Sequence, residues 1–177
     1  MAMDEKPIVA ALLKALADID GTTTERILHQ CIKASREQRY FDRTYDYPQE
    51  WRPVLRPRFE QYLVSNWGYV RLESKSIDRI LRPAFEHEYT RVGLSAPWRK
   101  RAGAMQHMVH ELVAESFILG SPIPEELRVK KSLQVVNHID GDKWHPAFHN
   151  LEITSHGDNM RHAYSTNLRD GRGSYGT

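Results

Sequence analysis

The sequence predicts an α+β fold: a helical N-terminal segment, a small antiparallel sheet module, and a C-terminal strand–loop–strand–helix unit. Three observations carry this prediction. Apolar residues recur at helical spacing up to about residue 40, and they alternate at period two from about residue 62. Near the C-terminus, two short apolar runs flank a long loop and precede a serine-capped helix. These changes divide the chain into residues 1–46, 47–130 and 131–166, followed by a Gly-rich tail, 167–177.

Composition bounds the class of protein. The 177 residues are 40% hydrophobic and 27% charged, which is a globular balance, and the net charge of +2 does not by itself indicate a nucleic-acid partner. Cys31 is the single cysteine, so an intramolecular disulfide and a four-cysteine zinc cage are excluded. The start lacks a signal-peptide pattern, and no apolar run is long enough to cross a membrane. We therefore expect a cytoplasmic protein without membrane contact.

The N-terminal segment predicts two helices. Residues 7–18 consist of strong helix formers, and Gly21 is expected to end that helix. Thr22 and Glu25 form a capping-box pattern that opens a second helix, which should run to about Tyr40. Two helices joined by a short turn could be a DNA-binding helix-turn-helix or a hairpin that packs on the rest of the protein, and the sequence leaves both open.

The middle segment predicts one small antiparallel sheet followed by a helix. The strands are expected at 62–65, 69–74, 80–83 and 89–94, and the first turn has Asn66 and Gly68 suited to positive φ. Residues 108–118 show the spacing of a helix with one buried face. His110 lies near the edge of that face, and a core or capping role, rather than that of a ligand, is expected for it.

Basic residues accompany the sheet. Arginine alternates faces on strands, so one side of the sheet is either a phosphate-contacting surface or a solvated face, and charge alone does not decide between them. The candidate DNA-contacting residues of this module are Arg71, Lys75, Arg82, Arg91, Arg99, Lys100 and Arg101.

The last third of the chain contains the candidate catalytic and metal-binding residues. Strands are expected at 133–139 and 151–154, and Ser155 should cap the following helix with Asp158 as its capping-box partner. This arrangement can bring the side-chain oxygens of Asn137 and Asn159 to a common point beside His138. Amide oxygens form a hard, incomplete site that suits Mg²⁺ or Mn²⁺. A metal ion with one positioned histidine is the minimum equipment for phosphodiester hydrolysis.

These residues resemble the HNH endonuclease motif of phage and intron-encoded homing endonucleases. The resemblance runs through Asn-His-Ile-Asp-Gly at 137–141, an Asn-Leu-Glu run at 150–152, and an asparagine at 159. Segments 50–54, 62–71 and 109–117 resemble the sheet module that accompanies the motif in those enzymes. The fold implied is a ββα-metal unit (the HNH or His-Me finger) behind a DNA-binding sheet.

The resemblance implies a role for each matching position. His138 would be the general base, Asn137 and Asn159 would hold one Mg²⁺ or Mn²⁺ ion per active site, and Asn150 would bridge the loop and orient His138. The implied reaction is hydrolysis of double-stranded DNA to 5′-phosphate and 3′-hydroxyl ends, in the host cytoplasm if a phage encodes the protein. Arg161 and His162 are further candidate DNA contacts. His162 could also assist the metal, or be a packing or solvent-exposed residue.

The sequence departs from the family pattern in several places. Many relatives have aspartate where this chain has Asn137, and often an Asn pair where it has His145-Pro146. His149 is also unusual, but nothing places it and His145 around one zinc ion. The C-terminal helix-turn-helix common in relatives is missing from this chain, and the N-terminal helices could replace it. The alternatives are a non-catalytic DNA-binding protein, such as a repressor or packaging accessory, and a structural or inhibitor protein. Target sequence, nicking against double-strand cleavage, and monomer against dimer stay open.

Overall fold

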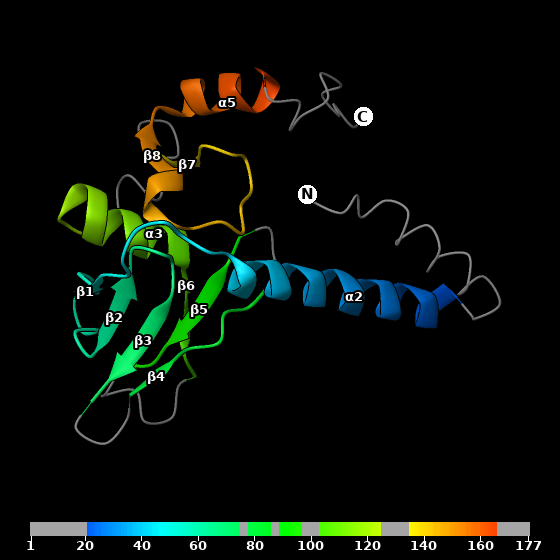
Figure 1. Cartoon of the computed structure of the whole chain (residues 1–177), viewed down its shortest axis with the longest axis horizontal. Coiled ribbons are helices and arrows are strands. Elements are labelled where there is room, and N and C mark those ends of the chain that lie inside the picture. Colours follow the sequence, from blue (N-terminus) through cyan, green and yellow to red (C-terminus); the bar gives the residue numbers. More distant parts are fainter. Residues whose placement is uncertain (1–20, 75–77, 86–88, 97–102, 125–134, 166–177) are drawn as a thin grey trace. The chain divides into compact units, whose positions relative to one another are not determined.

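The computed structural model describes residues 21–74, 78–85, 89–96, 103–124 and 135–165 (Figure 1). The chain divides into two compact units, Met1–Arg43 and Thr44–Thr177, and each is described by itself. The predicted helix at 7–18 and the predicted tail at 167–177 lie outside the described residues. None of the described helices is long and apolar enough to cross a membrane.

The first unit contains the helix α2, Gly21–Asp42. It confirms the predicted second helix and extends it by two residues beyond Tyr40. Gly21 is the first described residue of α2 rather than a break before it. Ile27, Leu28 and Cys31 are half-buried, and Ile32 is exposed.

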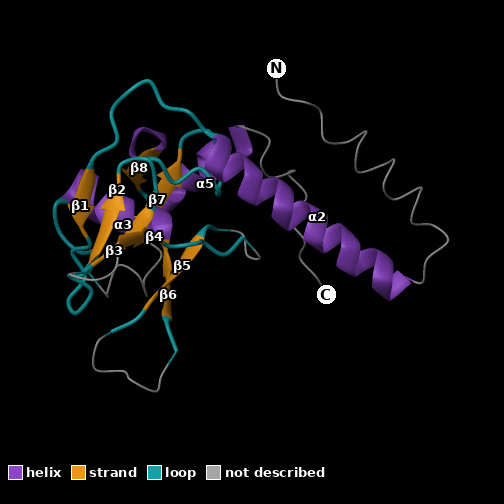
Figure 2. Ribbon diagram, turned by 60° about the horizontal axis from the view of Figure 1, so that its bottom comes forward, coloured by secondary structure: helices purple, strands orange, loops and turns teal. Residues whose placement is uncertain are grey.

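The second unit begins with a four-stranded antiparallel sheet in the order β1-β2-β3-β4 (Figure 2). Its strands are β1 (Trp51–Pro53), β2 (Tyr62–Ser65), β3 (Val70–Glu73) and β4 (Asp78–Ile80). The predicted strands at 62–65 and 69–74 are confirmed, and Tyr62 pairs with Leu72 in the register. Strand β1 was not predicted, because three residues ending in proline carry too little alternation to signal a strand.

The expectation of one sheet is wrong, because β5 (Arg91–Leu94) pairs with β6 (Met105–Met108) in a sheet of its own. Among the described residues, an isolated bridge between Ala84 and Arg91 links it to the preceding segment. The four residues of β6 had no strand signal, since two of them are methionine and the chain then turns directly into a helix. Strand β4 also ends at Ile80, three residues earlier than predicted.

The turn between β2 and β3 supports the C-terminal loop. Gly68 has φ of 92°, whereas Asn66 is not in the left-handed region, which corrects the prediction for Asn66. Asn66 instead works through its side chain, whose Oδ1 accepts the Glu50 N–H at 3.0 Å and whose Nδ2 donates to the Pro48 carbonyl at 3.0 Å. Its own carbonyl accepts the Phe148 N–H at 2.8 Å. The turn therefore connects the segment before β1 with the loop between β7 and β8.

The predicted helix at 108–118 is confirmed as two consecutive parts. The α-helix α3 spans Val109–Val113 and continues as a π-helix, η1, over Ala114–Leu119. Gly120, with φ of 66°, ends it. Val109, Leu112 and Val113 are fully buried and belong to the same core as residues of β2, β3 and β5. In Figure 1, α3 lies at the junction between these sheets and the C-terminal hairpin.

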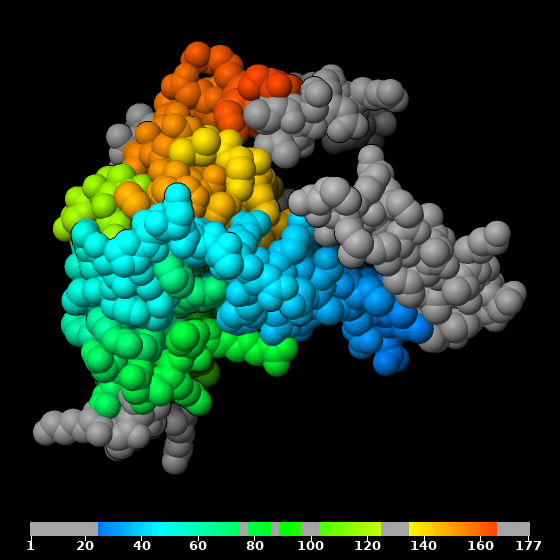
Figure 3. All heavy atoms as spheres, in the orientation of Figure 1, coloured from blue at the N-terminus to red at the C-terminus, as the bar shows by residue number. Residues whose placement is uncertain are grey.

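The predicted C-terminal unit is confirmed. It consists of β7 (Val135–His138), the short 3-10 helix η2 (Phe148–Asn150), β8 (Leu151–Thr154) and α5 (His156–Ser165). Strands β7 and β8 pair antiparallel, with Asn137 opposite Glu152 and His138 opposite Leu151. Leu151 is buried in the core cluster that includes β2 and α3, so the hairpin is held against the sheet module by a shared apolar core. Figure 3 shows these C-terminal residues, in yellow and orange, as a continuous surface with the module.

The helix α5 begins with the predicted capping box. Asp158 N–H donates to the Ser155 hydroxyl at 3.1 Å, and that hydroxyl donates to the Asp158 carboxylate at 2.6 Å. The cap satisfies one of the free N–H groups of the first turn. It thereby fixes the start of the helix that carries Asn159.

Replacing Gly68 by alanine is expected to destabilise the protein by about 1–3 kcal/mol. A Cβ at this position would lie 2.6 Å from Pro146 Cγ, on a backbone that alanine rarely adopts. Urea unfolding of the variant measures the effect. Gly103→Ala is the matched control, since a Cβ there meets nothing within 4 Å, and its free energy of unfolding should change by less than about 0.5 kcal/mol. Equal effects of the two substitutions would contradict the role of the Gly68–Pro146 contact.

Candidate active site

His138, the last residue of β7, is buried with 4% of its surface exposed. Its ring makes no hydrogen bond within the described residues, and Nε2 is buried without a partner. Two rings contact it instead: His110 of α3, at 5.0 Å between centroids and 74° between planes, and Tyr89, at 6.0 Å. Burial, and secondarily the neighbouring His110, lower the pKa of His138 to about 3. The side chain is therefore neutral near pH 7.

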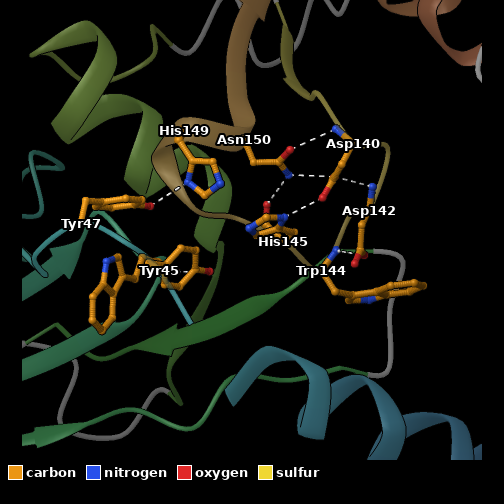
Figure 4. A network of polar contacts seen from close by, with 9 residues as sticks. Tyr45, Tyr47, Asp140, Asp142, Trp144, His145, His149 and Asn150 are labelled. Atoms are coloured by element: carbon orange, nitrogen blue, oxygen red, sulfur yellow. Dashed lines mark hydrogen bonds and ion pairs between the residues drawn. The ribbon is translucent and has the colours of Figure 1, made fainter. Parts of the chain in front are cut away.

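Asn150 bridges the loop that follows His138 (Figure 4). Its Oδ1 accepts the Asp140 N–H at 3.0 Å, while its Nδ2 donates to Asp140 Oδ1 at 2.8 Å and to the His145 carbonyl at 2.9 Å. Its backbone carbonyl also accepts the Ile139 N–H at 2.8 Å. One buried amide thus ties together both ends of the loop, starting at the residue after His138.

Asp140 is the second centre of this loop network. Its carboxylate accepts hydrogen bonds from Asn150 and from the backbone of Asp142, and it lies 2.6 Å from His145 Nδ1. Partial burial by itself would raise the pKa of Asp140, but the hydrogen bonds from His145, Asn150 and Asp142 lower it to about 2. The carboxylate is therefore ionised and acts as an acceptor that holds the loop in one conformation.

His145 and His149, which depart from the family pattern, lie among aromatic residues of the segment that precedes β1. The Tyr47 hydroxyl lies 2.7 Å from His149 Nδ1, and Tyr45 stacks on Trp67 at 5.2 Å between centroids (Figure 4). The His145 and His149 rings meet at 5.3 Å. Within the described part of the chain, no group of three or more His, Cys, Asp or Glu residues could hold a metal ion. The two histidines are thus packing and hydrogen-bonding residues of the loop.

Asn137 is buried and directed toward β8 and α5. Its Nδ2 donates to Glu152 Oε1 at 2.8 Å, directly across the hairpin, and lies 3.5 Å from His162 Nδ1. These contacts occupy the amide nitrogen and leave Oδ1 as the free acceptor. Asn159 lies one helical turn before His162 on α5 and is half-buried. Residues three apart share a helix face, so Asn159 belongs to the helix face that meets Asn137.

The donor set on this side of β7 fits a hard divalent cation. Amide oxygens such as those of Asn137 and Asn159, and a carboxylate such as that of Glu152 beside Asn137, are ligands that Mg²⁺ and Mn²⁺ prefer. His138 contacts α3 and Tyr89 on the other side, as expected for adjacent residues of a strand. The convergence of both amides beside the His138 ring stays a prediction, because the described contacts place Asn137 and His138 in different surroundings.

The predicted DNA-contacting residues are placed as follows. Arg71 forms ion pairs with Glu73 at 3.3 Å and Asp78 at 3.5 Å and lies over the Trp51 ring. Arg161 is exposed and paired with Asp158 at 2.8 Å. The remaining residues are Arg82, exposed; Arg91, half-buried on β5; and His162, beside Asn137. Lys75, Arg99, Lys100 and Arg101 lie outside the described residues.

Three residues of the site were not predicted from the sequence. Glu152 faces Asn137 because it is the opposite residue in the hairpin register, which the strand boundaries could have indicated. Tyr89 and His110 reach His138 from the sheet module, and the sequence holds no signal for a contact at that separation. Lys143 Nζ lies over the Tyr89 ring at 5.1 Å from the centroid, which adds a cation beside this aromatic group.

Acid is expected to weaken the fold through His110. Burial first, and the charge of Arg56 second, lower its pKa from 6.5 to about 3, so the folded protein keeps it neutral next to Tyr89 and His138. As pH falls below 6.5, the unfolded chain takes up this proton and the folded chain does not. The neutral, buried His110 therefore stabilises the fold fully when the pH is above its pKa in the unfolded chain. This stabilisation is lost as the pH falls toward its pKa in the folded chain.

When the pH is lowered from about 7.5 to about 5.5, the shifted pKa of His110 should by itself lower the free energy of unfolding by about 1 kcal/mol. Urea unfolding of the wild type and of His110→Phe at both values measures this contribution. The variant should lose less stability than the wild type over this interval. Equal losses would show that His110 is not the group responsible.

The chain was compared with known proteins, and no family model matches it. It is 35% identical over 118 residues to an HNH endonuclease of Acanthamoeba polyphaga mimivirus, covering 67% of this chain and 27% of that protein. It is also 35% identical over 86 residues to an SPbeta prophage-derived protein of Bacillus subtilis strain 168 that is named as an HNH homing endonuclease, covering 49% of this chain and 43% of that protein.

Among solved structures, the chain matches one of DNA binding and cleavage by the HNH homing endonuclease I-HmuI. The TM-score is 0.51 at 27% sequence identity, and the match covers 68% of this chain and 61% of that one. This chain spans less than two thirds of the length of each relative. The sequence similarities and the shared mixed fold, with its small antiparallel sheets and capped C-terminal helix, agree with each other. The chain belongs to the HNH homing endonuclease family.

Proposed function

We propose that this protein is a metal-dependent endonuclease of the homing type that hydrolyses phosphodiester bonds in double-stranded DNA, leaving 5′-phosphate and 3′-hydroxyl ends. The observation that carries the proposal is the environment of β7. A buried, neutral histidine stands at its end, and the preceding residue, Asn137, is held by Glu152 through its amide nitrogen. The family of the chain supports the same reaction class.

A histidine base and an oxygen-ligated ion that reach the same phosphate would suit an in-line displacement. When water attacks a phosphodiester, the attacking oxygen and the leaving oxygen lie on opposite sides of the phosphorus. His138 would take the proton of the attacking water on one side. Asn137 and Asn159 would hold the divalent ion on the other, with Glu152 fixing the Asn137 amide so that its oxygen faces the ion. When bound there, Mg²⁺ or Mn²⁺ supplies Lewis-acid stabilisation of charge on the phosphate and leaving oxygen.

The rest of the second unit would hold the base and the DNA. Asn150 keeps the loop after His138 in one conformation through its bonds to Asp140 and His145. A catalytic base that is held in its reactive position before the reaction loses less rotational freedom on the way to the transition state. Such pre-orientation is a main source of the rate enhancement of enzymes. We assign the positively charged side chains of the sheet module to phosphate contacts that flank the cut.

Incubation of the full chain with supercoiled plasmid DNA, with Mg²⁺, with Mn²⁺ or with EDTA, tests the proposal. Conversion to nicked or linear DNA with either metal, abolished by EDTA, is the expected result, and ligase should reseal the 5′-phosphate products. Salt-dependent DNA binding without cleavage under any metal would instead support the non-catalytic DNA-binding protein. Absence of both binding and cleavage would overturn both functions.

A further inference from the structure

The candidate base His138 lacks the hydrogen bond that usually orients a catalytic imidazole. In many enzymes a carboxylate or a backbone carbonyl binds the second ring nitrogen and fixes both the tautomer and the direction of the ring. Here the buried Nε2 has no partner, and the ring makes no hydrogen bond within the parts of the chain that the structure describes. Its orientation must then come from packing.

The packing partners are specific. The His110 ring meets the His138 ring nearly perpendicularly, at 74° with centroids 5.0 Å apart. Tyr89 contacts both, at 4.9 Å from His110 and 6.0 Å from His138. The His110–His138 pair is edge-to-face, a favourable arrangement for rings at this separation, whereas the two Tyr89 pairs are tilted, at 49° and 34°. The three rings thus form a cluster, His110–Tyr89–His138, that closes one side of the candidate base.

His110 is held inside the folded unit. It is 5% exposed, and its Nδ1 is buried without a partner. A side chain enclosed by close-packed neighbours has little freedom to turn. His110 follows Val109 on α3, and Val109 belongs to the apolar core that also contains residues of β2, β5 and β8, so the backbone that carries His110 is firmly held.

We propose that His110 is a positioning residue for His138: the edge-to-face contact of its ring holds the base in the orientation needed to deprotonate water. The inference rests on the proposed function, since it assigns His138 as the base. His110 touches neither DNA nor metal in this scheme and acts through the other histidine. Tyr89 completes the contact from the segment before β5.

Three variants at two positions test the inference in the full-length protein. His110→Ala removes the ring and is expected to lower kcat about 10- to 100-fold, the range that misplacement of a catalytic group produces. KM for DNA should be unchanged. His110→Phe restores a ring of similar size without ring nitrogens, and it should recover most of the lost kcat. Tyr89→Leu should lower kcat in the same direction and by less.

A double-mutant cycle separates positioning from general damage. If His110 acts through His138, adding His110→Ala to His138→Ala should not slow the residual cleavage further. A purely structural role would instead reduce it by the same factor in both backgrounds. Circular dichroism and urea unfolding of each variant identify a loss of folded protein, and rates are expressed per folded molecule.

The outcomes distinguish this inference from the proposed function. Full kcat in His110→Ala, or equal losses in the alanine and phenylalanine variants, would overturn the positioning role while an inactive His138→Ala keeps the endonuclease mechanism intact. Full cleavage in His138→Ala would overturn the proposed base itself. Independent, multiplicative effects in the double variant would also refute the positioning role.

Discussion

His138→Ala is expected to lower the cleavage rate about 10²–10⁴-fold, which is the usual contribution of general acid–base catalysis. The reason is that the alanine variant has no group at the end of β7 to accept a proton from water, while Asn137, Asn159 and the loop network stay in place. Single-turnover nicking of plasmid DNA measures the rate. Fluorescence anisotropy with a labelled duplex should show DNA affinity almost unchanged.

The control for this substitution is His29→Ala. His29 is exposed on α2, in the first unit, and its removal changes the histidine content without altering any residue of the second unit. The control should cleave at the wild-type rate. Near-full activity of His138→Ala would contradict the general-base mechanism. A loss of DNA affinity that parallels the loss of cleavage would show that His138 acts in binding instead.

Arg56→Met is expected to destabilise the protein by about 3–5 kcal/mol, the cost of breaking a buried ion pair by removing one partner. Arg56 donates to both carboxylate oxygens of Glu115, at 2.8 and 3.0 Å, and to Glu111 at 2.6 Å. Its side chain is 7% exposed and that of Glu115 is fully buried. Burial alone would lower the pKa of Arg56, but the hydrogen bonds and charges of Glu115 and Glu111 raise it above its ordinary value.

Urea unfolding measures the effect, with Arg161→Met as the matched control. Arg161 is 81% exposed in its pair with Asp158, and such exposed pairs contribute at most about 1 kcal/mol. Because Arg56→Met leaves the Glu115 carboxylate buried and uncompensated, the double variant Arg56→Met/Glu115→Gln should recover much of the stability. A loss below about 1 kcal/mol in the single variant would show that water reaches this cluster.

The Arg56 cluster contacts the same helical segment that carries His110. Glu111 and Glu115 belong to α3 and η1, and His110 stands in the same helix. The charge of Arg56 also lowers the pKa of His110. A substitution that loosens α3 should therefore affect the orientation of His138 before it unfolds the protein.

Local sequence patterns were sufficient for most elements near the candidate site. Alternation predicted β2 and β3, and a serine followed three residues later by an aspartate predicted the start of α5. Such signals act over a few residues, so they can be read without knowing the fold. Spacing in the HNH motif likewise placed Asn159 in the helix where it is found, whereas the short 3-10 helix that carries Asn150 was not predicted.

Local sequence patterns could not predict the pairing of β5 with β6. Strand β6 has four residues, Met105–Met108, without alternation, and it forms because β5 offers it backbone hydrogen bonds. The positive φ expected of Asn66 was wrong for a related reason. Its side chain is occupied by the backbone of Glu50 and Pro48, two groups brought to it by β1.

The sequence by itself determined the class of chemistry: a histidine beside an amide at a strand end, a loop-bridging asparagine, and a second amide in a capped helix. These are local features, and their chemistry follows from residue type and spacing. Only the tertiary structure decided how His138 is held. Its contacts with His110 and Tyr89, and the contact of Gly68 with Pro146, join residues far apart in the chain, because burial of a shared apolar core brings them together.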